Sequence, residues 1–103
     1  MERRVSITRL KPEFREKYLE AHRNVPEQVL ARYRELGMAN CSVYLLGVDL
    51  VLVTEAESHA ALDAALLNDP VDKEWQEFVR PMKADEDWQH MTQIYHVDLQ
   101  VSE

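Results

Sequence analysis

The sequence predicts a single domain of the α+β class, with a ferredoxin-like βαββαβ order and an antiparallel sheet. Three observations support this prediction. The chain has 103 residues, enough for one hydrophobic core. Short runs of alternating apolar and polar residues, typical of strands, stand on both sides of helical stretches. The second helical region is divided in two, which is a small elaboration of the ferredoxin-like pattern. We therefore expect residues 1–103 to form one domain.

The first half of the chain is expected to form a strand, a long helix and a second strand. Val5 to Thr8 alternates between apolar and polar residues, as a half-buried strand does. Pro12 to Gly37 has proline in its first turn and glycine at its end, which favours one long helix. Pro26 removes a backbone hydrogen bond and should kink this helix just after His22. Asn40 to Leu46 alternates again and should form the next strand.

The second half of the chain is expected to complete the sheet and to add two helices. Ser58 is a good N-cap, and Pro70 and Pro81 interrupt helical stretches. In order, we expect a tight turn at Gly47 to Asp49, a strand from Leu50 to Thr54, helices from Ser58 to Leu67 and from Val71 to Val79, a loop from Lys83 to Gln89 that contains Trp88, and a last strand from Thr92 to Leu99.

The strand at Leu50 to Val53 is apolar at every position, which is typical of a strand buried on both faces. Helices in a ferredoxin-like domain cover only one face of the sheet. A bare apolar face on a chain of this size would promote aggregation. We therefore expect a second copy to cover it, sheet against sheet, in a two-fold homodimer.

Composition excludes several classes of partner. The formal net charge of −7 argues against nucleic acid, because binding to phosphates depends on clustered Lys and Arg. No apolar run has the length of a membrane span, and no secretory signal is recognisable. Cys41 is the only cysteine, so an internal disulfide is impossible, and a reducing cytoplasm is the expected location.

Tyr18 and His22 are the first candidate functional residues. Residues four apart on a helix lie on the same face, so the phenol and the imidazole should point at the same space. Imidazole titrates near neutral pH and suits proton transfer. Trp75, on a later helix, provides an aromatic plate on which a small sugar can stack. The alternative interpretation, equally open for Trp75, is that these side chains only pack in the core.

The sequence gives no signature of a metal or a cofactor. Its histidines lack the spacing of metal ligands, and no phosphate loop or dinucleotide fingerprint is present. His90 and His96 have even spacing and could share a face of the last strand, so a metal site with His22 is conceivable. Cys41 lies among apolar residues in a strand, where a packing role is expected rather than a nucleophilic one. We expect neither a metal nor a cofactor.

Three stretches of the sequence together resemble the L-rhamnose mutarotase family over nearly the whole chain. They are Tyr18-Leu19-Glu20-Ala21-His22-Arg23-Asn24-Val25-Pro26-Glu27, Gly37-Met38-Ala39-Asn40-Cys41-Ser42-Val43-Tyr44-Leu45, and the helix that carries Trp75. The resemblance implies a dimeric α/β barrel that interconverts the α and β anomers of a deoxy-L-sugar without a cofactor. It also implies that His22 donates a proton and that Tyr18 and Trp75 contact the sugar.

The chain departs from the family pattern at two positions that the resemblance places beside the sugar. Cys41 stands where the family has a tyrosine, and Gln76 stands where it has the second residue of a Trp-Trp pair. Both are smaller than an aromatic ring, so the substrate need not be L-rhamnose, and L-fucose is the neighbouring candidate. Gln76 can form a hydrogen bond with a hydroxyl group that an indole cannot reach.

Two other functions stay open from the sequence. Domains of this architecture also serve as monooxygenases or dehydratases, which would use the same pocket. A non-catalytic dimer that binds a small ligand is the third possibility. The sequence does not reveal which group would complement His22 in acid–base chemistry, and both a water molecule and a sequence-distant carboxylate fit.

Overall fold

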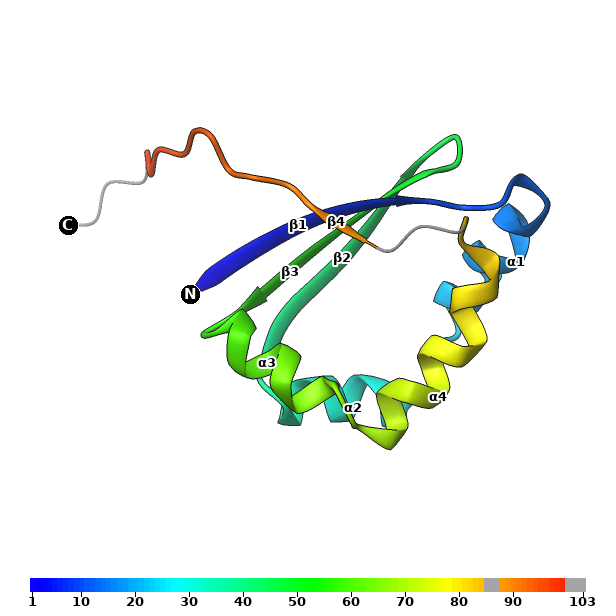
Figure 1. The fold of residues 1–103 in the computed structure, drawn as a ribbon, viewed down its shortest axis with the longest axis horizontal. Coiled ribbons are helices and arrows are strands. Elements are labelled where there is room, and N and C mark those ends of the chain that lie inside the picture. Colours follow the sequence, from blue (N-terminus) through cyan, green and yellow to red (C-terminus); the bar gives the residue numbers. More distant parts are fainter. Residues whose placement is uncertain (85–87, 100–103) are drawn as a thin grey trace.

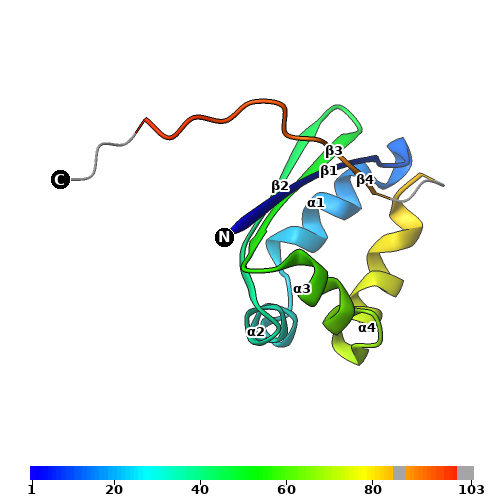
Figure 2. The same cartoon turned by 60° about the vertical axis from the view of Figure 1, so that its left-hand side comes forward.

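The computed structural model describes residues 1–84 and 88–99. Its centre is an antiparallel four-stranded sheet in the order β2-β3-β1-β4, with the helices gathered on one face (Figure 1; Figure 2). The elements are β1 Glu2–Arg9, the 3₁₀ turn η1 Pro12–Phe14, α1 Arg15–Arg23, α2 Glu27–Glu35, β2 Met38–Leu46, β3 Asp49–Ala56, α3 His59–Leu66, α4 Pro70–Val79, the 3₁₀ turn η2 Arg80–Met82 and β4 Gln89–His90. This order and this sheet confirm the predicted α+β, ferredoxin-like fold.

The hairpin of β2 and β3 forms where the sequence predicts it. Gly47 closes the turn with a positive φ of 62°, a conformation that glycine adopts without a steric penalty. Pairs such as Val5↔Val53 join β3 to the central strand β1. Because side chains alternate along a strand, Cys41 and Val43 of β2 point to the helices while Tyr44 points to the opposite face. The predicted strand and its alternation are therefore confirmed.

The single long helix expected from Pro12 to Gly37 is wrong. The chain forms η1, α1 and α2 instead, and the predicted kink is a complete break between α1 and α2. The residue before a proline avoids helical angles, and the chain already leaves the helix at Asn24, which has φ −134° and ψ 46°. Pro26 then stands as the N-cap of α2, and Gly37, with φ 103°, follows the end of α2 as predicted.

Both later helices are confirmed. The Ser58 hydroxyl accepts a hydrogen bond from the Ala61 N–H at the start of α3. The Asp69 carboxylate accepts from the Asp72 N–H in the same way at the start of α4, where Pro70 fills the first position. Asp72 and Gln76 are four residues apart in α4, so their side chains lie on the same face of the helix. Both belong to the site described below.

The last strand expected from Thr92 to Leu99 is wrong. Among the described residues after Lys83, only Gln89 and His90 form a strand with β1, and residues 91–99, here called the C-terminal arm, have no regular structure and extend away from the body (Figure 1; Figure 2). The pairing Ser6↔His90, continued one for one, would bring residue 95 opposite Met1. Residues 96–99 would run past the end of β1, so no strand beside them completes a ladder. In the predicted loop from Lys83 to Gln89, residues 85–87 lie outside the described residues.

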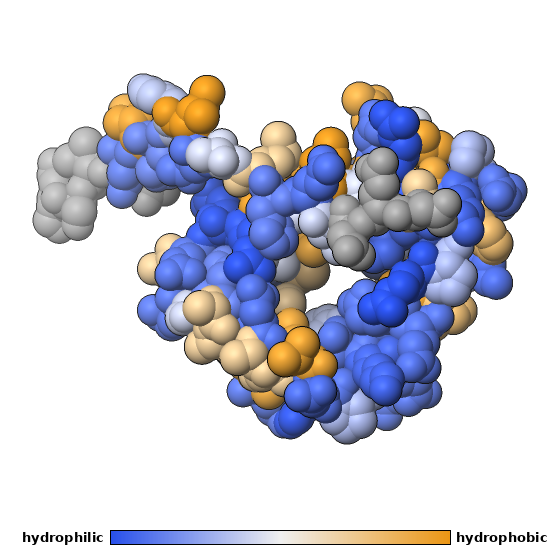
Figure 3. All heavy atoms as spheres, in the orientation of Figure 1, coloured by the Kyte–Doolittle hydropathy of each residue, from blue (hydrophilic) through white to orange (hydrophobic). Residues whose placement is uncertain are grey.

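The hydrophobic core lies at one end of the sheet, around the β2–β3 turn and α1. It is built from a cluster of buried side chains, Leu10, Tyr18, Leu50, Val79 and Met82. Val51 and Val53 stay partly exposed on the face without helices, so the two-sided burial expected for β3 is not reached within one chain. At the other end of the sheet the helices stand apart from the strands and leave a hollow, which is visible in Figure 3.

Candidate functional site

The hollow is a cavity of about 290 Å³ between the helices and the inner face of the sheet. This volume lies at the lower end of the range of small-molecule sites, roughly 300–1,000 Å³. The five site residues expected from the sequence all line it: Tyr18, His22, Cys41, Trp75 and Gln76. The structure thus brings together residues from α1, β2 and α4, while their individual roles stay predictions.

His22 is held in one tautomer by its own helix. Its Nδ1 lies 3.0 Å from the Tyr18 carbonyl oxygen, four residues earlier. A carbonyl oxygen only accepts, so Nδ1 must carry the proton and donate it. Nε2 is therefore the nitrogen left to accept or donate a proton in the cavity. The imidazole also contacts the Tyr18 ring at 4.3 Å between centroids and the Trp75 ring at 5.7 Å, at an angle of 70° between the Trp75 and imidazole planes, and these contacts fix its orientation.

Tyr18 lies deeper than its predicted role suggests, because only 4% of its surface is exposed. Burial, with a smaller contribution from Cys41, raises the pKa of its hydroxyl to about 12. The hydroxyl is therefore neutral at physiological pH and can donate and accept hydrogen bonds, but it does not supply a phenolate. This suits a residue that positions a ligand or supports His22.

Cys41 contributes a protonated thiol to the cavity wall. Its side chain is exposed to the cavity, yet the surrounding protein raises the pKa of the thiol by desolvation. A thiol with a raised pKa is a poor nucleophile. The expectation that Cys41 packs rather than reacts fits this environment, and its small size leaves space in front of β2.

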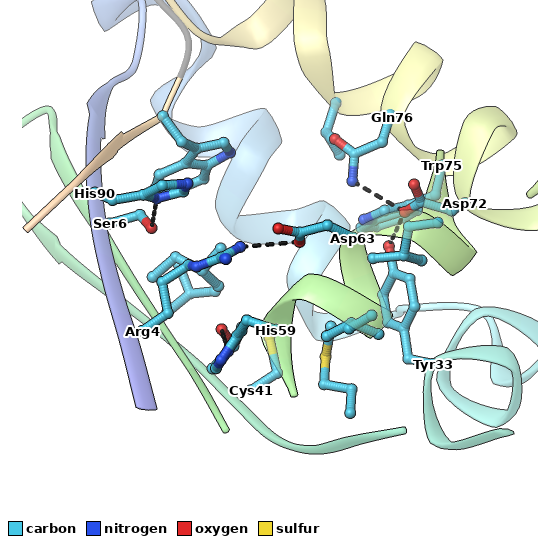
Figure 4. A pocket seen from close by; sticks show the side chains of 18 of the residues that line it. Arg4, Ser6, Tyr33, Cys41, His59, Asp63, Asp72, Trp75, Gln76 and His90 are labelled. Atoms are coloured by element: carbon cyan, nitrogen blue, oxygen red, sulfur yellow. Dashed lines mark hydrogen bonds and ion pairs between the residues drawn. The ribbon is translucent and has the colours of Figure 1, made fainter. Parts of the chain in front are cut away.

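A polar group that sequence reasoning missed lies at the α2–α4 side of the cavity. The Tyr33 hydroxyl donates to Asp72 Oδ1 at 2.5 Å, and Gln76 Nε2 donates to the same oxygen at 3.3 Å (Figure 4). Burial, and next the bond to Asp72, raise the pKa of Tyr33 far above its ordinary value. The spacing of Asp72 and Gln76 on one helical face was the available signal, whereas Tyr33 comes from a different helix.

The opposite side of the cavity carries a second set of polar contacts. Arg4 Nη1 donates to Asp63 Oδ1 at 2.9 Å, and this bond lowers the pKa of the Asp63 carboxyl. Ser6 Oγ and His90 Nδ1 lie 2.8 Å apart (Figure 4). Trp88, in the predicted loop, also lines the cavity. Both contacts join residues far apart in the sequence, so no local sequence pattern indicates them.

Nothing in the described part of the chain forms a metal centre, since no three or more His, Cys, Asp or Glu side chains there are grouped to hold an ion. His90 lines the cavity, but His96 is exposed in the C-terminal arm and is absent from the lining. A site made by these two residues with His22 is therefore not supported. Among the described helices, none combines the length and apolar character needed to cross a bilayer.

A larger hollow, of about 630 Å³, lies on the outer side of the helices. It reaches Trp75 from the other side, and its lining includes the helix break at Asn24 and Pro26. The lining includes neither His22 nor Gln76. The inner cavity is the better candidate for a functional site, because its lining combines groups that can transfer a proton and an aromatic side chain.

An antiparallel sheet with helices on one face, and a polar and aromatic cavity between them, defines a small-molecule site in a ferredoxin-like α+β domain. A family model described as L-rhamnose mutarotase matches residues 3–97. The chain therefore belongs to the L-rhamnose mutarotase family, a family of isomerases. No curated protein sequence matches it.

Solved structures show how widely this fold is shared. An L-rhamnose mutarotase from Formosa agariphila has a TM-score of 0.80 and 13% sequence identity, covering 95% of this chain and 100% of that one. Tetracenomycin F2 cyclase from Streptomyces glaucescens has a TM-score of 0.66 and 16% identity, covering 97% and 100%. An antibiotic biosynthesis monooxygenase has a TM-score of 0.65 and 16% identity, covering 92% and 100%. At these identities the likeness concerns the fold alone.

Proposed function

We propose that this protein is a mutarotase that interconverts the α and β anomers of a 6-deoxy-L-hexose, either L-rhamnose or L-fucose. The observation that carries the proposal is His22, whose Nδ1 is bound to the Tyr18 carbonyl so that Nε2 is left for proton transfer in the cavity. Membership of the L-rhamnose mutarotase family supports this reaction. The presence of Trp75 in the cavity lining, in contact with the imidazole, supports a ligand with an apolar ring face.

The reaction needs two proton transfers and no covalent intermediate. When both ring nitrogens of His22 are protonated, Nε2–H gives its proton to the ring oxygen while the anomeric hydroxyl loses a proton to a second group, and the ring C–O bond breaks to give the open aldehyde. Rotation and closure on the other face reverse both transfers and return each proton. A positioned acid or base contributes on the order of 10²–10⁴-fold to such a step. A water molecule or the Asp63 carboxylate, which also lines the cavity, is the candidate for the second group.

The choice of sugar depends on the two positions where the chain departs from the family pattern. The small Cys41 leaves space beside β2, and Gln76 offers an amide where an indole would stand. Trp75 stays available for stacking against the C–H face of the ring. In this proposal the substrate is a 6-deoxy-L-hexose that places a hydroxyl group toward α4, which keeps L-fucose as a candidate beside L-rhamnose.

Saturation-transfer NMR tests the function by measuring anomer exchange in L-rhamnose, L-fucose and related aldoses, with and without the protein. We expect faster exchange for at least one 6-deoxy-L-hexose and little change for D-glucose as a control. If no sugar exchanges faster, the mutarotase proposal is wrong. Saturable sugar binding, measured by the fluorescence of Trp75 and Trp88, without faster exchange would instead identify a ligand-binding protein.

We also propose a homodimer in which the helix-free faces of two sheets meet. This face presents apolar side chains from three strands, among them Val5, Val53 and Tyr44, and no helix covers it (Figure 1). The C-terminal arm adds Ile94 and Leu99, which are 93% and 82% exposed. Such a surface is typical of an interface between subunits.

The shape of the single chain supports the same proposal. Its radius of gyration is 14.9 Å, whereas a compact domain of this length has about 13 Å, and the extended arm accounts for the difference. Light scattering at micromolar concentration should give twice the 12.1 kDa of one chain. Val51→Lys, on the helix-free face, should reduce the mass to that of one chain. A parental protein that is monomeric would contradict the proposal.

A cytoplasmic location is the last part of the proposal. Support comes from the absence of any cysteine pair in the sequence and from the free thiol of Cys41 in the cavity wall. Enzymes of this type would then meet their sugar after its uptake into the cell.

A further inference from the structure

Tyr33, Asp72 and Gln76 form a hydrogen-bonded group at one side of the cavity, here called the acceptor cluster. Asp72 and Gln76 lie one turn apart on α4, and Tyr33 reaches them from α2. All three side chains line the cavity, and Figure 4 shows them on the side away from the Ser6–His90 contact. Trp75 neighbours Gln76 on the same helix, so a ring stacked on this indole would lie close to the cluster.

The hydrogen bonds within the cluster determine which of its atoms can bind a ligand. A carboxylate only accepts, so the Tyr33 hydroxyl and the Gln76 amide nitrogen must both act as donors to Asp72 Oδ1. This orientation turns the Gln76 amide so that its oxygen is the free atom. Within the described part of the chain, no side chain donates to Asp72 Oδ2. The cluster thus offers two acceptors, Asp72 Oδ2 and Gln76 Oε1.

The position of Asp72 at the start of its helix distinguishes it from the other carboxylate of the cavity. Asp72 is in the first turn of α4, where the positive end of the helix dipole stabilises a carboxylate. The other carboxylate in the lining, Asp63, already accepts from Arg4 at 2.9 Å. Asp72 is therefore the cavity carboxylate best placed to accept a hydrogen bond from a ligand.

We propose that Asp72, held by Tyr33 and Gln76, binds a ring hydroxyl of the sugar and selects substrates that carry it. This inference rests on the proposed mutarotase function. It adds the residue that determines which sugar the protein selects. Acceptors require a donor, and the hydroxyl groups are the donors that a sugar brings. A charged acceptor is left unpaired when the matching hydroxyl is missing, which makes discrimination strong. Tyr33 acts as a positioning residue, because its hydroxyl is occupied by Asp72.

The test combines one substitution with a set of substrates. kcat and KM for anomer exchange are measured for the parental protein and for Asp72→Asn, with the preferred sugar and with its analogues that lack one ring hydroxyl each. We expect one analogue to lose about 10- to 100-fold in kcat/KM with the parental protein. Asp72→Asn should lose a similar factor with the complete sugar, mainly through KM, and little more with that analogue.

Two further variants make the test specific. Asp63→Asn removes the other cavity carboxylate and should change kcat/KM by a similar factor for every analogue. Tyr33→Phe should lose less kcat/KM than Asp72→Asn, and its loss should depend on the same ring hydroxyl. This variant keeps the proposal testable if Asp72→Asn fails to fold. Equal losses by Asp72→Asn for all sugars, or selectivity that follows Asp63, would overturn the proposal.

Failure of the proposed function gives a different result. If the parental protein accelerates no sugar, the same variants and analogues are compared by binding, measured as quenching of Trp75 fluorescence. If Asp72→Asn binds the complete sugar more weakly than the parental protein does, but binds one analogue equally well, the result would support the acceptor cluster in a non-catalytic protein. No binding of any sugar by the parental protein would overturn both proposals.

Discussion

Replacement of His22 by alanine is the most direct test of the proposed chemistry. The substitution removes the only imidazole that contacts both Tyr18 and Trp75 among the described residues. Water can still fill the space, but it does not supply a positioned acid or base. We therefore expect the rate of anomer exchange to fall by about 10²–10⁴-fold, the usual contribution of one acid–base group.

The variant should remain folded. His22 makes two aromatic contacts, worth about 0.5–1.5 kcal/mol each. Its hydrogen bond to the Tyr18 carbonyl adds about 1 kcal/mol. The sum of about 2–4 kcal/mol is smaller than the roughly 5–15 kcal/mol that stabilises a typical domain. A fall in the melting temperature with an unchanged circular dichroism spectrum is thus expected.

The assay is saturation-transfer NMR on the sugar that the parental protein turns over fastest. His90→Ala serves as a matched control, because His90 lines the same cavity but is engaged with Ser6 on the other side. The control should keep the exchange rate within about tenfold of the parental rate. A folded His22→Ala variant that exchanges anomers at the parental rate would refute the role assigned to this imidazole.

Three other predictions concern stability. Ser58→Ala should lower the free energy of unfolding by about 1 kcal/mol, seen in urea titrations, because α3 loses its N-cap; no change would show that the cap bond is not formed in solution. The pKa of Asp69 is lowered chiefly by the hydrogen bond from the Asp72 N–H and next by Arg32. The ionised Asp69 carboxyl therefore contributes stability above pH ~4, and this stability is lost as pH falls through the lowered pKa. Asp69→Asn should flatten this acid dependence, and an unchanged profile would contradict it. Burial raises the pKa of Tyr18 to about 12, so its neutral form contributes stability that is complete below pH ~10 and is lost as pH rises to about 12. Tyr18→Phe should remove this alkaline loss, and its persistence would assign the loss to another group.

Local patterns predicted the elements well because each has a local cause. Ser58 caps α3 in the structure as its type suggests, and Gly37 ends α2 with a positive φ. The alternation from Asn40 to Leu46 correctly separated the cavity side of β2 from its outer side. The helix break was underestimated because Pro26 was judged alone. Its effect on the residue before it turns a kink into a break.

The C-terminal arm shows where periodicity is insufficient. Alternation from Thr92 to Leu99 is a real property of the sequence, but a strand exists only when another strand lies beside it. The register of β4 against β1 leaves residues 96–99 beyond the end of the sheet.

The candidate site likewise contains residues that the sequence could place together and residues that it could not. Tyr18 and His22 could be placed together from their spacing, and their contact at 4.3 Å agrees. Trp75 was a candidate as an aromatic plate and Gln76 entered through a family resemblance, and the structure brings them to the same cavity. Tyr33 could not be found, because its bond to Asp72 joins residues 39 positions apart on different helices.

In the proposed function, proton transfer depends on α1 and the choice of sugar depends on α4. The tautomer of His22 is set by the backbone of α1, through the Tyr18 carbonyl, and does not depend on any side chain of α4. The acceptors that would select a hydroxyl group belong to α4 and are held by Tyr33. Substitutions at Asp72 or Gln76 should therefore change which sugar is preferred while the proton-transfer group stays in place. A cavity built in this way allows the substrate to diverge within a family whose chemistry is retained, because binding and proton transfer depend on different residues.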